Sequence, residues 1–174
     1  MTDAGPAASD AVIGATAGLL VSRLIERGWT VAVAESLTGG LVVSSLISVP
    51  GASAAVRGGI VAYATALKHS LLGVDAALLD AEGAVHPDVA RQMAEGVREA
   101  ATVDAAAADV GIATTGVAGP TPQDGRPVGT VYVAVATPAG TRVASLSLEG
   151  TRAQIRSAAT AAALALALEC TASN

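Results

Sequence analysis

The chain has 174 residues, of which 52% are hydrophobic and only 2% aromatic, so we expect one compact domain with a core of Ala, Val, Leu and Ile. The formal net charge of −5 argues against a nucleic-acid backbone as partner, because such binding needs clustered Lys and Arg. A single cysteine, Cys170, excludes an internal disulfide and a multi-cysteine metal cluster.

The N-terminal residues 1–9 are expected to be disordered, and residues 10–174 are expected to form the domain. The start of the chain lacks a basic region followed by an apolar one, so it does not resemble a secretion signal. The apolar stretch 158–168 is too short to span a bilayer, and the stretch 11–24 is interrupted by polar residues. We therefore expect a soluble, cytoplasmic protein with no membrane partner.

The first half of the chain alternates helices and strands. A helix is predicted over residues 10–27, with Ser9-Asp10 as its cap and an apolar stripe formed by Val12, Ile13, Leu19, Leu20, Leu24 and Ile25. Small and β-branched residues then predict strands over 29–34 and 57–63, with a helix over 41–47 between them. Thr65 is expected to cap a short helix that carries Lys68 and ends at Gly73.

The second half contains a helical turn at 74–79, a helix over 87–101 that opens with His86-Pro87, and a strand over 109–115. A loop over 116–127 leads to strands 129–136 and 142–148, which are predicted to form a hairpin. The last helix, 151–169, begins with a capping-box pattern from Thr151 to Gln154. This order predicts a three-layer α/β/α sandwich with a mixed sheet, because the late hairpin must be antiparallel.

The stretch from Ala32 to Gly40 places a carboxylate, two hydroxyls and two glycines between a buried strand and a helix. Such a turn leaves backbone N–H groups that the helix cannot satisfy, and these donors suit a phosphate or a developing oxyanion. The alternative is that Ser36 or Thr38 simply caps the helix while the glycines permit a tight turn.

Lys68 is the only lysine among ten basic residues, and the other nine are arginines. A lysine can lose its proton when it is desolvated, whereas an arginine cannot, so the single lysine indicates a position that needs a base. A neutral lysine near neutral pH needs a large depression of its pKa, which burial and a nearby positive charge such as Arg57 can supply. The alternative is an ordinary solvated lysine on a helix.

Four segments together resemble the CinA C-terminal domain family, whose members include nicotinamide-nucleotide amidohydrolases. The resemblance covers the chain beyond its N-terminal tail and is carried by residues 34–40 (AESLTGG), 58–68 (GGIVAYATALK) with 72–74 (LGV), 115–120 (TGVAGP) and 127–132 (PVGTVY). The sequence departs from the family pattern at Leu37, where many members have Cys, at residues 121–125, which replace a glycine-richer loop, and at Thr151, where Asp is frequent.

The resemblance implies metal-independent deamidation of nicotinamide mononucleotide to nicotinate mononucleotide and ammonia, without a cofactor. It also implies a Ser–Lys mechanism in which Ser36 is the nucleophile, Lys68 the base and Tyr63 a neighbouring group. Two other functions stay open: a non-catalytic nucleotide-binding or regulatory domain, and a serine amidase for another small amide. Because family members often carry a second domain and this chain stands alone, we expect a homo-oligomer.

Further residues are candidates for binding the nucleotide substrate. They are Glu35, Thr38, Gly39, Gly40, Thr115, Gly116, Gly119 and Arg152. Each has a structural alternative: Glu35 can orient the turn, the glycines can pack against a neighbouring strand, and Arg152, like Arg156, can lie on the surface. The two histidines, His69 and His86, lack the partners of a metal site, so no metal is expected.

Overall fold

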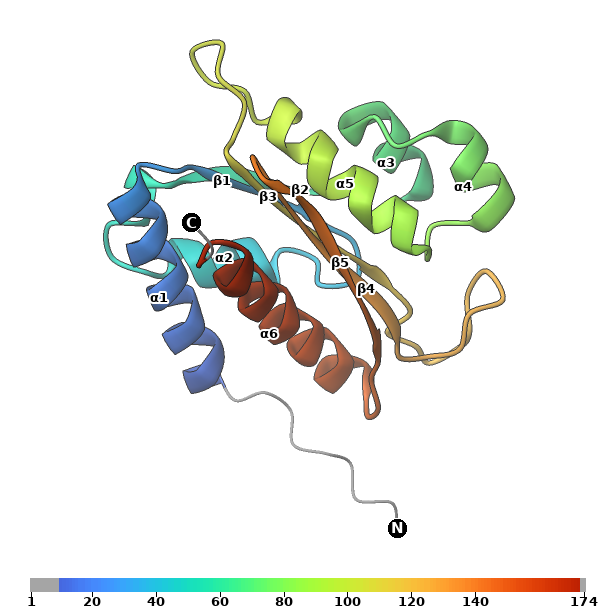
Figure 1. The fold of residues 1–174 in the computed structure, drawn as a ribbon. Helices are drawn as coiled ribbons and strands as arrows, with labels where there is room; N and C mark the ends of the chain where they lie inside the picture. The colour runs from blue at the N-terminus through green and yellow to red at the C-terminus, as the bar shows by residue number, and fades with distance from the viewer. Residues whose placement is uncertain (1–9, 173–174) are drawn as a thin grey trace.

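The computed structural model describes residues 10–172, which form a five-stranded sheet between two layers of helices (Figure 1). The strands are β1 (Val31–Glu35), β2 (Val56–Val61), β3 (Val110–Gly116), β4 (Thr130–Thr137) and β5 (Gly140–Ser147). The helices are α1 (Asp10–Arg27), α2 (Leu41–Ile47), α3 (Thr65–Leu72), α4 (Ala76–Glu82), α5 (Pro87–Ala100) and α6 (Arg152–Cys170), with a short 3-10 turn at Ala52–Ala54. The expected three-layer α/β/α sandwich is confirmed.

The sheet is mixed, with the strand order β2-β1-β3-β4-β5. The central strand β1 pairs in parallel with β2 and β3, so that Glu35 lies beside Val61 on one side and Thr114 on the other. Strands β3, β4 and β5 are antiparallel to their neighbours, as predicted for the hairpin. The carboxyl ends of three parallel strands therefore meet at one edge of the sheet, where open α/β sheets usually bind ligands.

Two apolar cores flank the sheet because its side chains alternate between the two faces. One face packs against α1, α2 and α6, and the other against α3, α4 and α5 (Figure 1). Val31 and Val33 of β1 point to the first core, whereas Ala32 and Ala34 point to the second. The small residues on the second face allow α5 to approach the sheet closely: a Cβ at Gly111 would lie 1.9 Å from the Ala94 carbonyl oxygen.

Several local predictions are wrong in detail. Thr65 does not cap α3, because the N-cap is Ala64 and makes no side-chain hydrogen bond. Half of the predicted apolar stripe of α1 is exposed, namely Val12, Leu19 and Ile25, and Ala17 and Val21 take the buried positions. Ser9 and the predicted tail lie outside the described residues. The capping box of α6 is present, with Thr151 and Gln154 bonded reciprocally.

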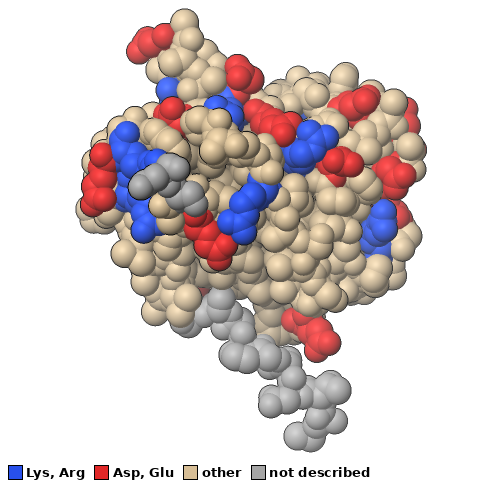
Figure 2. Space-filling view, viewed as in Figure 1, with Lys and Arg blue, Asp and Glu red and all other residues tan. Residues whose placement is uncertain are grey.

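Among residues 10–172, no helix is both long and apolar enough to cross a membrane. Figure 2 shows basic and acidic side chains interspersed on the face in view, with uncharged surface between them.

Candidate active site

A pocket of about 300 Å³ opens at the carboxyl edge of the parallel strands. It receives residues from the ends of β1, β2 and β3, from α3, from the α4–α5 connection, from the loop after β3 and from the start of α6. Its walls are formed by Ser36, Leu37, Tyr63, Lys68, Ala84, Val85, Thr115–Gly119, Thr121–Gln123 and Arg152. This volume is at the lower end of the range for small-molecule sites.

Ser36 and Lys68 are in direct contact inside this pocket. The Lys68 ammonium Nζ donates to Ser36 Oγ over 3.1 Å and to the Ala62 carbonyl oxygen over 2.7 Å. Lys68 is fully buried and Ser36 is 8% exposed. The contact arises because β1 ends directly before Ser36, while β2 ends beside it and leads into α3, whose first turn carries Lys68. A serine hydroxyl within hydrogen-bond reach of an amine is the arrangement of an activated nucleophile.

The environment of Lys68 makes its ammonium easier to deprotonate than that of an ordinary lysine. The pKa of Lys68 is lowered from 10.5 to about 8: burial is the larger cause and lowers it, whereas the negative charge of Asp124 raises it. The solvated-lysine alternative is therefore wrong. Arg57, the positive charge suggested as one possible contributor, is not a cause of this shift, and its guanidinium binds the Ala101 carbonyl oxygen at the end of α5.

Tyr63 and Arg152 lie together on the pocket wall. Arg152 donates to the Tyr63 hydroxyl over 3.1 Å and to the Gly119 carbonyl oxygen over 2.7 Å. Tyr63 is 61% exposed, so it is not a core residue. Its hydroxyl is paired with Arg152, and the hydrogen bonds of Lys68 go to Ser36 and Ala62. The structure thus brings the cation of Arg152 to the pocket that contains Ser36.

Glu35 is the buried cap of α2, and it does not line the pocket. Its carboxylate accepts hydrogen bonds from the backbone N–H groups of Gly40, Val42 and Val43 over 2.9, 3.1 and 2.8 Å. Two expectations for this turn are therefore wrong: neither the Ser36 nor the Thr38 side chain caps α2, and the helix N-terminus is not free to bind a phosphate. The alternative that Glu35 orients the turn is confirmed. The negative carboxylate also interacts favourably with the helix dipole.

Replacing Glu35 with Ala is expected to lower the free energy of unfolding by about 2–4 kcal/mol, because it leaves three N–H groups without a partner at a buried helix end. Chemical denaturation of the variant measures this loss. Glu26→Ala, at an exposed position of α1, is the control and should change stability by less than about 0.5 kcal/mol. A Glu35→Ala protein as stable as the control would contradict the capping role.

The other predicted residues of this turn support Ser36 and are not on the pocket wall. The Thr38 hydroxyl contacts the Thr114 hydroxyl of β3 over 2.7 Å. Arg156 donates to the carbonyl oxygens of Leu37 and Thr38 over 2.8 and 2.9 Å, so it holds the turn and is not placed to meet a phosphate. Gly39 and Gly40 have positive φ angles of 61° and 101°, which explains why the turn contains two glycines.

Thr115, Gly116 and Gly119 do line the pocket. The Thr115 hydroxyl donates to the Ala84 carbonyl oxygen over 2.7 Å and so fixes the α4–α5 connection against β3. A Cβ at Gly116 would lie 2.6 Å from the Thr130 carbonyl oxygen, which indicates that close pairing with β4 requires this glycine. The sequence interpretation missed Ala84 and Val85 altogether, because neither residue type carries a chemical signal.

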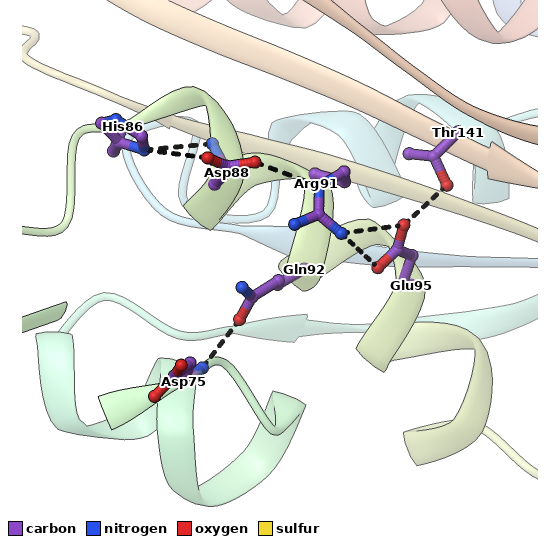
Figure 3. Close-up of polar contacts among 7 residues, drawn as sticks. All are labelled: Asp75, His86, Asp88, Arg91, Gln92, Glu95 and Thr141. Carbon is purple, nitrogen blue, oxygen red and sulfur yellow. Dashed lines mark hydrogen bonds and ion pairs between the residues drawn. The ribbon is translucent and has the colours of Figure 1, made fainter. Parts of the chain in front are cut away.

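The two histidines have structural partners. His69 Nδ1 lies 2.7 Å from the Val74 carbonyl oxygen, and His86 Nδ1 accepts from the Asp88 N–H at the start of α5. Figure 3 shows this helix start and the polar contacts that follow it, in which Arg91 joins Asp88 to Glu95, and Glu95 accepts from Thr141 of β5. The described residues contain no group of three or more His, Cys, Asp or Glu that could hold a metal ion.

Similarity to known proteins covers nearly all of this fold. A CinA-like protein of Frankia casuarinae is 52% identical over 149 residues, which are 86% of this chain and 33% of that protein. A competence/damage-inducible protein of Agrobacterium tumefaciens has a solved structure with a TM-score of 0.85, 31% identity, and coverage of 99% of this chain and 100% of that one. The competence damage-inducible protein A of Klebsiella pneumoniae gives a TM-score of 0.85 at 30% identity, with coverage of 92% of this chain and 97% of that one.

The chain spans about a third of the length of the curated relatives that it matches. The CinA C-terminal domain family matches residues 14–171, which include every residue of the pocket described above. The chain therefore belongs to the CinA C-terminal domain family.

Proposed function

We propose that this protein is a metal-independent amidase that hydrolyses nicotinamide mononucleotide to nicotinate mononucleotide and ammonia. The observation that carries the proposal is the 3.1 Å contact between the Lys68 amine and the Ser36 hydroxyl, in a pocket that shields the lysine from water. A domain that only binds nucleotides has no need to bury a lysine against a serine without an ion pair among the described residues, because desolvating that charge costs free energy.

In the proposed reaction, neutral Lys68 takes the proton of Ser36 while Ser36 Oγ attacks the carbonyl carbon of the carboxamide. The oxyanion that forms needs N–H donors. Among the described residues, the backbone N–H of Leu37 has no hydrogen-bond acceptor, and Leu37 lines the pocket. The amide after a nucleophile at a strand-to-helix turn is a common oxyanion donor, so we assign this role to Leu37.

Collapse of the tetrahedral intermediate breaks the carbon–nitrogen bond, and the Lys68 ammonium returns its proton to the leaving nitrogen, which departs as ammonia. This leaves an ester between Ser36 and the nicotinoyl group. Lys68, neutral again, then deprotonates a water molecule that attacks the ester, and its proton finally returns to Ser36 Oγ. The products are nicotinate mononucleotide and the free enzyme, so atoms and protons balance.

Arg152 supports a phosphorylated substrate. Its guanidinium lies on the pocket wall and is held by the Gly119 carbonyl and the Tyr63 hydroxyl. A planar guanidinium binds phosphate through two parallel hydrogen bonds. We assign Arg152 to the substrate phosphate and Tyr63 to the orientation of Arg152.

The direct test is ammonia release from nicotinamide mononucleotide in buffer containing EDTA, with nicotinamide riboside measured alongside. The expected result is hydrolysis of the mononucleotide and much slower hydrolysis of the riboside, because the riboside lacks the phosphate. Equal rates would point to an amidase for another small amide. Binding of the mononucleotide without ammonia release would support a non-catalytic domain and overturn the proposal.

The pH dependence gives a further prediction. Because protonated Lys68 cannot accept the Ser36 proton, kcat/KM should rise with pH through an apparent pKa near 8 and fall about tenfold per unit below it. Initial rates at low substrate concentration between pH 6 and 9.5 measure this profile. A profile that is flat over this range would contradict a lysine base.

A further inference from the structure

The loop between β3 and β4 forms one wall of the pocket, to which it contributes Thr121, Pro122 and Gln123. The backbones of Gln123 and Arg126 then exchange two hydrogen bonds of 3.1 and 2.8 Å, which form a short hairpin with Asp124 and Gly125 at its tip. Asp124 has a φ of 51°, a left-handed conformation that Asp tolerates better than most residues. The hairpin therefore holds the Asp124 side chain at a defined place.

The tip of this hairpin is fastened to the connection between α4 and α5. The Asp124 carboxylate accepts a hydrogen bond from the Ala84 N–H over 3.1 Å. A Cβ at Gly83 would lie 2.7 Å from Asp124 Oδ2, so this approach requires a glycine at position 83. Arg126 adds an exposed ion pair with Glu82 at 3.7 Å. Because Ala84 also lines the pocket, the contact joins two separate segments of its wall.

We infer that Asp124 is a positioning residue for the pocket that holds Ser36 and Lys68: its carboxylate fastens the 121–127 loop to Ala84 of the pocket wall, and this contact places a negative charge beside the pocket, where it acts on Lys68. The contact with Ala84 supports the first part. The second part agrees with the direction in which Asp124 moves the pKa of Lys68, which is upward and opposite to burial. Asp124 is exposed, so solvent screens its charge. Burial therefore has the larger effect on the pKa of Lys68.

Other ionisable groups lie on or next to the segments that line the pocket of Lys68. They are Glu35 at the end of β1, Tyr63 after β2, His69 in α3, Glu82 in α4, His86 before α5, Arg126 in the β3–β4 loop and Arg152 in α6. Glu35 is held by the α2 backbone, His69 by Val74, and Arg152 by Gly119 and Tyr63. Burial and Asp124 are the two influences that move the pKa of Lys68.

The test uses the fact that Lys68 is the only lysine in the chain. Protein labelled with ¹³C at the lysine ε carbon gives one side-chain NMR signal, whose shift with pH reports the protonation of Lys68 without any substrate. Asp124→Asn keeps an oxygen that can accept from Ala84 but removes the charge, so Lys68 is expected to titrate at lower pH than in the natural protein. If Lys68 titrates at the same pH in Asp124→Asn as in the natural protein, the electrostatic part of the inference is overturned.

Asp104→Asn is the matched control. Asp104 also has a φ of 51° and sits in a short hairpin closed by Val103 and Ala106, none of which lines the pocket. This control removes the same charge from the same backbone conformation, and it should leave the Lys68 titration unchanged. A shift as large as that of Asp124→Asn would show a general charge effect and overturn the assignment to Asp124.

Hydrogen exchange of the Ala84 amide tests the fastening. In Asp124→Ala, the Ala84 amide hydrogen should exchange at least about tenfold faster than in the natural protein. In Asp124→Asn, its exchange rate should stay close to that of the natural protein. Unchanged exchange in Asp124→Ala would overturn the positional part. The inference deepens the proposed amidase function and rests on it for its catalytic meaning, but both measurements need no turnover, so a failure to hydrolyse nicotinamide mononucleotide would be recorded separately.

Discussion

Ser36→Ala is expected to lower kcat for ammonia release by up to about 10⁶-fold while leaving the dissociation constant of nicotinamide mononucleotide nearly unchanged. The Ser36 hydroxyl is the oxygen that forms the acyl bond, and its removal leaves no nucleophile beside Lys68. The pocket otherwise stays intact, because the Ser36 backbone N–H still bonds to the Thr114 carbonyl oxygen. Ser36→Ala should therefore still bind the substrate although it no longer hydrolyses it.

Steady-state kinetics and calorimetric binding together measure this separation. Ser48→Ala is the control: its hydroxyl binds the Ser44 carbonyl on the exposed side of α2, so its removal should leave kcat within about twofold. A Ser36→Ala enzyme that keeps more than about a tenth of the natural turnover would show that Ser36 is not the nucleophile.

Lys68→Arg is expected to be nearly as inactive as Lys68→Ala, with both losing at least about 10⁴-fold in kcat/KM. An arginine keeps the positive charge but has a pKa above 12, so it cannot take the proton of Ser36. If Lys68 served only to attract the substrate phosphate, arginine would restore much of the activity, because it binds phosphate at least as well. Kinetics of the two variants decide between these roles, with circular dichroism to show that both are folded.

Lys68→Met tests how Lys68 makes the free energy of unfolding depend on pH, independently of its proposed role in catalysis. The folded protein holds Lys68 with a pKa of about 8, below its ordinary 10.5, so between these pH values the unfolded chain binds a proton that the folded chain does not. The free energy of unfolding of the natural protein should therefore rise with pH across this window, by about 3 kcal/mol in total. Lys68→Met should lack this rise, and denaturation curves at pH 7, 9 and 10.5 measure the difference. If the free energy of unfolding changed with pH by the same amount in both proteins, a lowered pKa of Lys68 would be contradicted.

The sequence predicted the order of the elements and the class of the fold. Apolar periodicity located the strands and helices to within a few residues, and the hairpin around Gly140 identified the mixed sheet, because these signals are local. The same holds for the capping box at Thr151, whose partners are three residues apart. The proposed catalytic residues of the protein were identified from the family resemblance together with the single lysine at position 68.

The tertiary structure decided which of the polar residues face the pocket. Glu35 and Ser36 are neighbours in sequence, yet the pleat of β1 and the turn after it send Glu35 to the N-terminus of α2 and Ser36 to the pocket. The burial of Lys68 depends on packing between α3 and distant segments, so no helical pattern could show it. Asp124 contacts Ala84 across 40 residues of chain, and it does so through the backbone N–H of Ala84. Such long-range contacts leave no periodic mark in the sequence, because they arise only when the sheet brings separate loops to one edge.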